Sequence, residues 1–130
     1  MLKFDIEKEN TGVSDTRNKG IEKATGTLVN FLDSDDKLEK DTLKNVWSFY
    51  EKNKEKVDLI TIPVNWFDGM KGKHILNNKF QKTRVIDIKE EPNLIVMSSS
   101  ASFIKREELK EEKFDTTLKY GEDAKLVSKI

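Results

Sequence analysis

The stretch that decides the fold is "GVSDTRNKGIEKATGTLVNFLDSDDKL", residues 12–38, in which a helical pattern passes into an apolar run that ends in carboxylates. Apolar and small residues first recur at helical spacing, which predicts a helix with Thr11 or Ser14 as its N-cap and Gly26 as its stop. Residues 27–32 then form a short, mostly apolar run, which is typical of a strand in the interior of a sheet. The acidic residues at the end of this strand are therefore the first candidate site.

The rest of the chain continues this alternation of strands and helices. The expected elements are a strand at 2–6, a helix at 40–52, strands at 57–67, 84–88 and 93–105, and a helix at 122–130. In the helix at 40–52, Leu43, Val46, Trp47 and Tyr50 form an apolar stripe, and Trp47 fits core packing. This order predicts the α/β class, with a mixed sheet flanked by helices.

Length and composition limit the class of protein. The chain has 130 residues, which fits one domain, and it has no cysteine, which excludes disulfides, thiolate metal sites and cysteine nucleophiles. Its 24 Lys and Arg balance 24 Asp and Glu, so we expect no nucleic-acid partner. No apolar run approaches the roughly 20 residues that cross a bilayer, so we expect no membrane segment in this chain.

Asp33, Asp35 and Asp36 place three carboxylates within four residues. Like charges this close together are unfavourable, and a hard cation such as Mg2+ or Mn2+ relieves their repulsion. Since Mg2+ usually shares its coordination shell with substrate phosphates, one interpretation is a metal that bridges the protein to a phosphorylated ligand. The other interpretation is a polar turn and a helix N-cap, because Asp and Ser favour both. The tetrapeptide alone leaves both open.

Two other metal sites fit this sequence less well. A calcium loop of the EF-hand type needs Gly at its sixth position and Glu at its twelfth, where counting from Asp33 gives Leu38 and Lys44. A phosphatase of the haloacid-dehalogenase type also places Asp-x-Asp after an apolar strand. That family expects Gly-Thr-like residues next, near the N-terminus, whereas Asp36 and Lys37 follow here, after a complete predicted helix.

The opening stretch resembles the core of the family 2 glycosyltransferases, which have the GT-A fold. These commonly read Gly-x-Ser-x-Ala-Arg-Asn-x-Gly-Ile and later Phe-Leu-Asp-x-Asp-Asp, and Thr16 stands here where Ala is usual. "SSASFIKREEL", residues 99–109, resembles the family's strand and helix beneath the acceptor site. "FDTTLKYGEDAKL", residues 114–126, resembles its Phe-Asp-Glu-x-Leu-x-x-Gly-Glu-Asp segment, with Thr116 in place of an acidic residue. The resemblance covers nearly the whole chain, with three motifs in the right order.

Members of this family transfer a sugar from a nucleotide-diphosphate donor to an acceptor hydroxyl with inversion. By this resemblance, Asp35 would coordinate Mg2+ or Mn2+ on the diphosphate, and Asp33 would lie by the donor ribose or sugar. Arg17 would lie near the nucleotide or diphosphate, where a guanidinium suits phosphate; the alternative is a salt bridge to Asp15, Asp33 or another carboxylate. Asp36 is either a ligand or a helix-start residue.

The resemblance also implies a general base. Asp123, in the pair Glu122-Asp123, would take the proton of the acceptor hydroxyl during in-line attack; its alternative role is to favour the first turn of a helix. Trp66 and Phe67 could line an acceptor platform or pack in the core. The serine-rich run 98–102 could offer polar groups near the donor sugar or acceptor, or be a plain strand.

The family begins with a Val-Ser-Ile-Ile-Val-Pro strand and a second strand that ends in an acidic turn, and these hold the base and ribose. Nothing in this sequence matches them, so the resemblance implies a single partial domain, residues 1–130, that lacks the N-terminal nucleotide-binding strands. We therefore expect the isolated chain to have little or no transferase activity. We also expect a homodimer through an exposed sheet edge.

The phrase "NLIVMSSSASFIKREEL" is similar to glycosyltransferase domains of bacterial wall-polymer enzymes. The expected partners are a nucleotide-sugar and a glycan or polyol acceptor. The expected location is cytoplasmic, or peripheral to the inner face of the membrane through other regions or partners. A non-catalytic binding or assembly module that retains the glycosyltransferase outline is the alternative from a different class.

Overall fold

The structure is a computed structural model that describes residues 12–65, 82–94 and 100–110. In chain order, its elements are α1 (Val13–Lys23), β1 (Leu28–Asn30), α2 (Thr42–Asn53), β2 (Leu59–Thr61), the 3-10 helix η2 (Pro92–Leu94), β3 (Ser102–Lys105) and the 3-10 helix η3 (Arg106–Leu109). This combination of helices with a small sheet confirms the α/β class. The strand expected at 2–6 and the helix expected at 122–130 lie outside the described residues.

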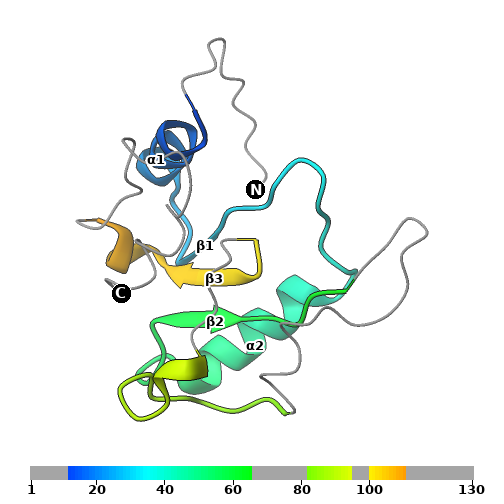
Figure 1. Cartoon of the computed structure of the whole chain (residues 1–130), viewed down its shortest axis with the longest axis vertical. Coiled ribbons are helices and arrows are strands. Elements are labelled where there is room, and N and C mark those ends of the chain that lie inside the picture. The colour runs from blue at the N-terminus through cyan, green and yellow to red at the C-terminus, as the bar shows by residue number, and fades with distance from the viewer. Residues whose placement is uncertain (1–11, 66–81, 95–99, 111–130) are drawn as a thin grey trace.

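The three described strands form one sheet in the order β1-β3-β2, with β3 between its two neighbours (Figure 1). Both ladders are antiparallel, so β1 and β2 run in the same direction on either side of β3. Val29 and Leu59 are both register partners of Ile104. Within the described ranges, β1 is thus an outer strand, although its apolar run predicted an interior one. Accordingly, its residues are half-buried, whereas Ser102, Phe103 and Ile104 of β3 are buried.

One face of the sheet carries the hydrophobic core. Ile104 is 1% exposed and packs in a cluster with Ile21 of α1, Phe31 after β1 and Leu109 of η3. Val29 and Leu59, its partners in the two ladders, pack against the same cluster. Because successive side chains of a strand point to opposite faces, this alternation directs α1 and η3 to the Ile104 face.

The opposite face meets α2. Val46 and Tyr50 of α2 are buried, and an open, mainly apolar groove of about 400 Å3 lies between the helix and Phe103 of the sheet. The prediction that Trp47 packs in the core is wrong. Its side chain is 44% exposed along this groove, and its ring lies 5.4 Å from that of Tyr50. Leu43 is 61% exposed, so the outer half of the predicted apolar stripe remains in contact with solvent.

The ends of α1 differ from the sequence prediction. Gly12 is the N-cap with φ 98°, whereas Ser14 lies inside the first turn, where its buried Oγ has no hydrogen-bond partner among the described residues. At the other end, the N–H of Ala24 donates to Gly20 O and the chain then becomes extended, so the helix stops before Gly26. A positive φ suits glycine alone, which explains why Gly12 takes the cap position.

The strand predicted at 84–88 is wrong, because this segment is irregular and turns back on itself. The backbone N–H groups of Glu90 and Glu91 donate to Asp87 O, and the N–H of Lys89 donates to Asp87 Oδ1. Arg84 then forms two hydrogen bonds to Glu91, of 2.8 and 2.9 Å. These local bonds satisfy the backbone in a turn and outweigh the strand propensity of the apolar residues.

The remaining predictions are confirmed within the described residues, except at one end. The helix expected at 40–52 is α2, the strand expected at 57–67 contains β2, and the strand expected at 93–105 contains β3, with η3 after it. Residues 93–94 belong to η2 and not to a strand, and residues 66–67 and 95–99 lie outside the described residues. No helix among the described residues has the length and apolar character needed to cross a membrane.

Candidate functional site

The acidic residues lie on a tight turn that directly follows β1. The backbone N–H of Asp36 donates to Asp33 O at 3.0 Å, which closes a four-residue turn. Asp and Ser are favoured in such turns because their side chains tolerate and support the turning backbone. The polar turn of the second interpretation is therefore present, and it is compatible with a metal at the same place. The helix-start role for Asp36 is wrong, because α2 begins only at Thr42, with Asp41 as its N-cap.

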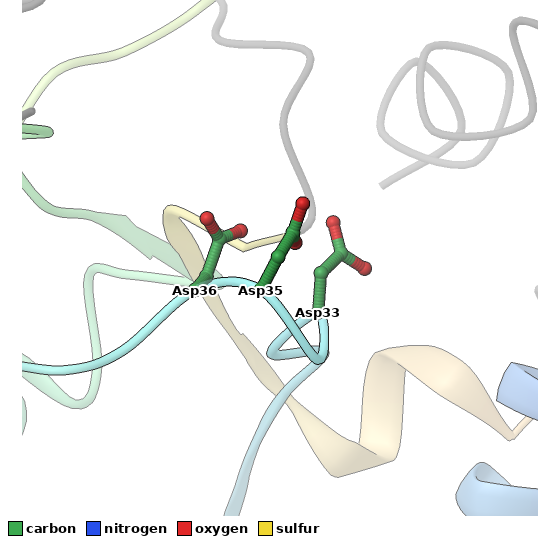
Figure 2. A group of neighbouring side chains, drawn as sticks. All are labelled: Asp33, Asp35 and Asp36. Atoms are coloured by element: carbon green, nitrogen blue, oxygen red, sulfur yellow. The ribbon is translucent and has the colours of Figure 1, made fainter. Parts of the chain in front are cut away.

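The turn brings three carboxylates to one place, so that turn and cluster are the same feature. One oxygen each of Asp33, Asp35 and Asp36 lies within 4.8 Å of the others, and all three residues are exposed. Figure 2 shows the three side chains rising from the same side of the turn. Oxygens that share one Mg2+ lie at most about 4.2 Å apart, since each bond is about 2.1 Å. The carboxylates are thus gathered close to that spacing.

This donor set fits a hard divalent cation. All its ligand atoms are carboxylate oxygens, which Mg2+ and Mn2+ prefer, and the described part of the cluster offers no nitrogen or sulfur ligand. The exposure of the cluster leaves room for water or phosphate oxygens to complete a coordination shell. Of the candidate site residues predicted from the sequence, the structure thus brings Asp33, Asp35 and Asp36 together on this turn.

Arg17 of α1 reaches the same turn. Its Nη2 lies 3.0 Å from Asp33 Oδ1, and its side chain is only 11% exposed, against 46% for Asp33. The salt-bridge alternative raised for Arg17 is therefore what the structure shows. The guanidinium places a positive charge beside three negative ones, which lowers the repulsion within the cluster.

A second contact holds the other oxygen of Asp33. Ser100, just before β3, donates from its Oγ to Asp33 Oδ2 at 3.1 Å. Ser100 is in turn fixed by Asn30, the last residue of β1, whose side-chain Nδ2 donates to Ser100 O at 3.0 Å and to Ser102 O at 2.8 Å. Both oxygens of Asp33 therefore accept a hydrogen bond, each from a different element.

Sequence reasoning missed Asn30 and pointed only to the serine run as a whole. A signal was present, because Asn30 is an amide inside the apolar run Leu-Val-Asn-Phe-Leu, where an apolar residue would be expected. A polar side chain that is half-buried in a strand needs partners, and here these are two carbonyl groups. Asp123, Trp66 and Phe67 lie outside the described residues, so their predicted roles stay predictions.

Comparisons with known proteins agree with the family resemblance of the sequence motifs. Residues 3–112 match the family described as glycosyl transferase family 2. The chain is 43% identical over 123 residues to the minor teichoic acid biosynthesis protein GgaB of Bacillus subtilis (strain 168), and 35% identical over 120 residues to GgaA of that strain. These alignments cover 95% and 89% of this chain, but only 14% and 27% of the relatives.

A solved structure shows the same fold. The chain is similar to the crystal structure of residues 1–349 of TarS from S. aureus, with a TM-score of 0.73 and 24% identity. The match covers 95% of this chain and 36% of the TarS chain, and it confirms the predicted fold class. The family match covers most of the chain, in agreement with the motifs around Arg17 and the acidic turn. This chain belongs to glycosyl transferase family 2.

Proposed function

We propose that this chain is part of the core of a metal-dependent inverting glycosyltransferase, which transfers a sugar from a nucleotide-diphosphate donor to an acceptor hydroxyl. The observation that carries this proposal is the convergence of Asp33, Asp35 and Asp36 on one exposed turn, with Arg17 beside it. Family membership supports the reaction class, and the oxygen donor set supports a cation of the Mg2+ or Mn2+ kind.

Each residue of the cluster has its own proposed role. Asp35 would hold the cation, and Asp33 would lie by the donor ribose or sugar with its carboxylate held by Arg17. Before the donor binds, Asp33 would also share the cation, because one of its oxygens lies within 4.8 Å of those of Asp35 and Asp36. Arg17 would also favour an approaching diphosphate, because a guanidinium remains charged and offers several N–H donors. A bound cation supplies charge stabilisation for the departing nucleotide diphosphate.

We assign the general base to Asp123, which lies in the Gly-Glu-Asp segment outside the described residues. Inversion requires a base on the acceptor side that removes the hydroxyl proton as the oxygen attacks the sugar carbon. A carboxylate that is ionised at neutral pH can accept this proton directly. The Asp123→Asn variant should therefore lose transfer while it keeps binding of the metal and donor.

The acceptor is proposed from the relatives. GgaB and GgaA are described as minor teichoic acid biosynthesis proteins, which suggests a glycan or polyol acceptor in cell-surface polymer synthesis for this chain. Such a reaction would use cytoplasmic nucleotide-sugars, so we propose a cytoplasmic location, or one at the inner face of the membrane. A panel of nucleotide-sugars is the probe that identifies the donor and the sugar.

The test measures Mn2+-dependent nucleotide-sugar binding and transfer of radiolabelled sugar by the native protein that carries this chain. Asp35→Asn should abolish metal-dependent binding, whereas Asp41→Asn should keep it, because Asp41 is an exposed aspartate whose side chain makes no capping bond. We expect the 130-residue chain alone to show little transfer, since it spans a small share of its relatives. Absence of both binding and transfer in the native protein would favour the non-catalytic module.

A further inference from the structure

We propose that Asn30 and Ser100 are positioning residues, which together fix the direction of the Asp33 carboxylate within the cation cluster. This inference rests on the proposed function, because it concerns how the same cluster is prepared for its ion. Both of these side chains lie outside the acidic turn. Neither one would contact the ion; each acts through the next residue in the order Asn30, Ser100, Asp33.

The first step is the attachment of the Ser100 segment to β1. The side-chain amide of Asn30 has two N–H groups, and its nitrogen lies within hydrogen-bond distance of two carbonyl oxygens, those of Ser100 and Ser102. Ser102 is fully buried at the start of β3, so one of the two bonds reaches into the interior of the sheet. This pair of hydrogen bonds fixes the position of Ser100 relative to Asn30 at the end of β1. Asn30 itself lies three residues before Asp33.

The second step is the orientation of the carboxylate. Ser100 Oγ holds Asp33 Oδ2 from one side, and the guanidinium of Arg17 holds Oδ1 from the other. A carboxylate with a donor on each oxygen is restrained from rotating about its terminal torsion. Each oxygen retains a further acceptor site, because a carboxylate offers about four lone-pair positions. The two hydrogen bonds therefore fix the orientation of the Asp33 carboxylate and leave its oxygens able to coordinate a cation.

A purely structural role fits Ser100 poorly. The Ser100–Asp33 bond joins a half-buried hydroxyl to a side chain that is 46% exposed, where water can replace the lost partner. Such a bond adds little to folding stability. The direction of a ligating carboxylate, in contrast, matters to ion affinity, and partners that hold such ligands typically change affinity by about 10–100-fold when they are removed.

The experiment measures the dissociation constant for Mn2+ alone, from the electron paramagnetic resonance signal of free Mn2+, with the native full-length protein. Ser100→Ala should weaken Mn2+ binding about ten-fold, with an almost unchanged melting temperature. Ser100→Thr keeps the hydroxyl and should retain the unsubstituted affinity. Ser48→Ala, an exposed serine of α2, is the matched control and should change nothing.

A double-mutant cycle tests whether Ser100 acts through Asp33. In an Asp33→Ala background, Ser100→Ala should have no further effect on Mn2+ affinity, whereas a general structural effect would persist there. Asn30→Ala should reproduce the weakening, with Asn45→Ala, an exposed asparagine of α2, as its control. The inference is overturned if the Ser100→Ala variant binds Mn2+ as tightly as the unsubstituted protein does. It is also overturned if Ser100→Ala weakens Mn2+ binding equally in the unsubstituted and the Asp33→Ala backgrounds.

The same data separate this inference from the proposed function. A protein that binds Mn2+ and responds to Ser100→Ala as expected, but transfers no sugar, would overturn the proposed transferase and support the positioning role. A protein that transfers sugar and ignores Ser100→Ala would do the reverse. Failure of the unsubstituted protein to bind Mn2+ would overturn the positioning role, and failure to transfer sugar as well would overturn both.

Discussion

The guanidinium of Arg17 lies 3.0 Å from Asp33 Oδ1, so that α1 is joined directly to the turn after β1. This contact places a positive charge beside Asp33, one of the three clustered carboxylates, and Arg17 is the more buried partner. The two residues are 16 positions apart, and the intervening chain contains the end of α1 and all of β1. The ion pair thus links α1 to the end of the β1 segment at the candidate site.

Replacement of Arg17 by glutamine should lower the melting temperature most at low ionic strength. The variant leaves three exposed carboxylates with less positive charge beside them, and we expect a loss of about 1 kcal/mol in unfolding free energy. Added salt or Mn2+ should recover part of the loss, because both reduce repulsion. Lys19→Gln, which removes the exposed pair with Asp15, is the control and should change less. Equal, salt-independent losses in both variants would contradict this prediction.

Two glycines of the opening stretch should respond in opposite ways to alanine. Gly12 has φ 98° and ψ 161°, a conformation that only glycine adopts readily, so Gly12→Ala should cost about 1–3 kcal/mol. Gly20 lies within α1 with open space around its Cα, so Gly20→Ala should stabilise the chain by about 0.5–1 kcal/mol. Chemical denaturation measures both changes. A tolerated Gly12→Ala would show that the backbone at the start of α1 can relax.

The cluster around Ile104 should dominate stability. Leu109 has no exposed surface, and its replacement by alanine should cost about 2–5 kcal/mol, because the cavity adds to the lost burial. Leu43→Ala removes the same side chain from a position that is 61% exposed and should change the unfolding free energy by less than about 0.5 kcal/mol. Comparable losses in urea unfolding would mean that the groove beside α2 contributes as much as the core.

The Arg84–Glu91 pair predicts a specific dependence on pH. The hydrogen bonds from Arg84 lower the pKa of Glu91 below its ordinary value of 4.5, because they stabilise the carboxylate. The contribution of the pair is therefore present above pH 4.5 and is lost as the pH falls through the lowered pKa of the folded state. The melting temperatures of the unsubstituted chain and Glu91→Gln should accordingly converge in acid.

The matched control for this pH effect is Glu90→Gln, at the neighbouring exposed glutamate of the same turn. Its difference from the unsubstituted chain should show no convergence that follows the titration of Glu91. A gap between Glu91→Gln and the unsubstituted chain that stays constant down to strongly acidic pH would show that the carboxylate charge is not what stabilises this turn.

Local patterns predicted the parts of the fold that local forces form. The spacing of Val46 and Tyr50 was sufficient to identify α2, and both residues are buried as that spacing requires. The acidic turn was likewise predictable from its Asp and Ser content. The strand prediction for residues 84–88 was wrong because the Arg84–Glu91 ion pair and the backbone hydrogen bonds to Asp87 determine the conformation of this segment. Strand propensity contains no information about either interaction.

Long-range contacts set the limit for the candidate site. The motif suggested which carboxylates matter, but the bond from Ser100 to Asp33 depends on how β3 pairs with β1. The same register decides that Asn30 faces the carbonyl groups of the β3 segment. No pattern within one segment contains this information, because the partners come from opposite ends of the described chain.

The Ser100–Asp33 bond spans 67 residues, which has a consequence for the order of folding. Closing so long a loop carries an entropy cost that must be met before the contact stabilises anything, so pairings of this kind form late. The acidic turn itself needs only four neighbouring residues and can form early. During synthesis, the cluster would therefore acquire its final orientation only after β3 has emerged and paired with β1, so high ion affinity would appear together with the completed sheet.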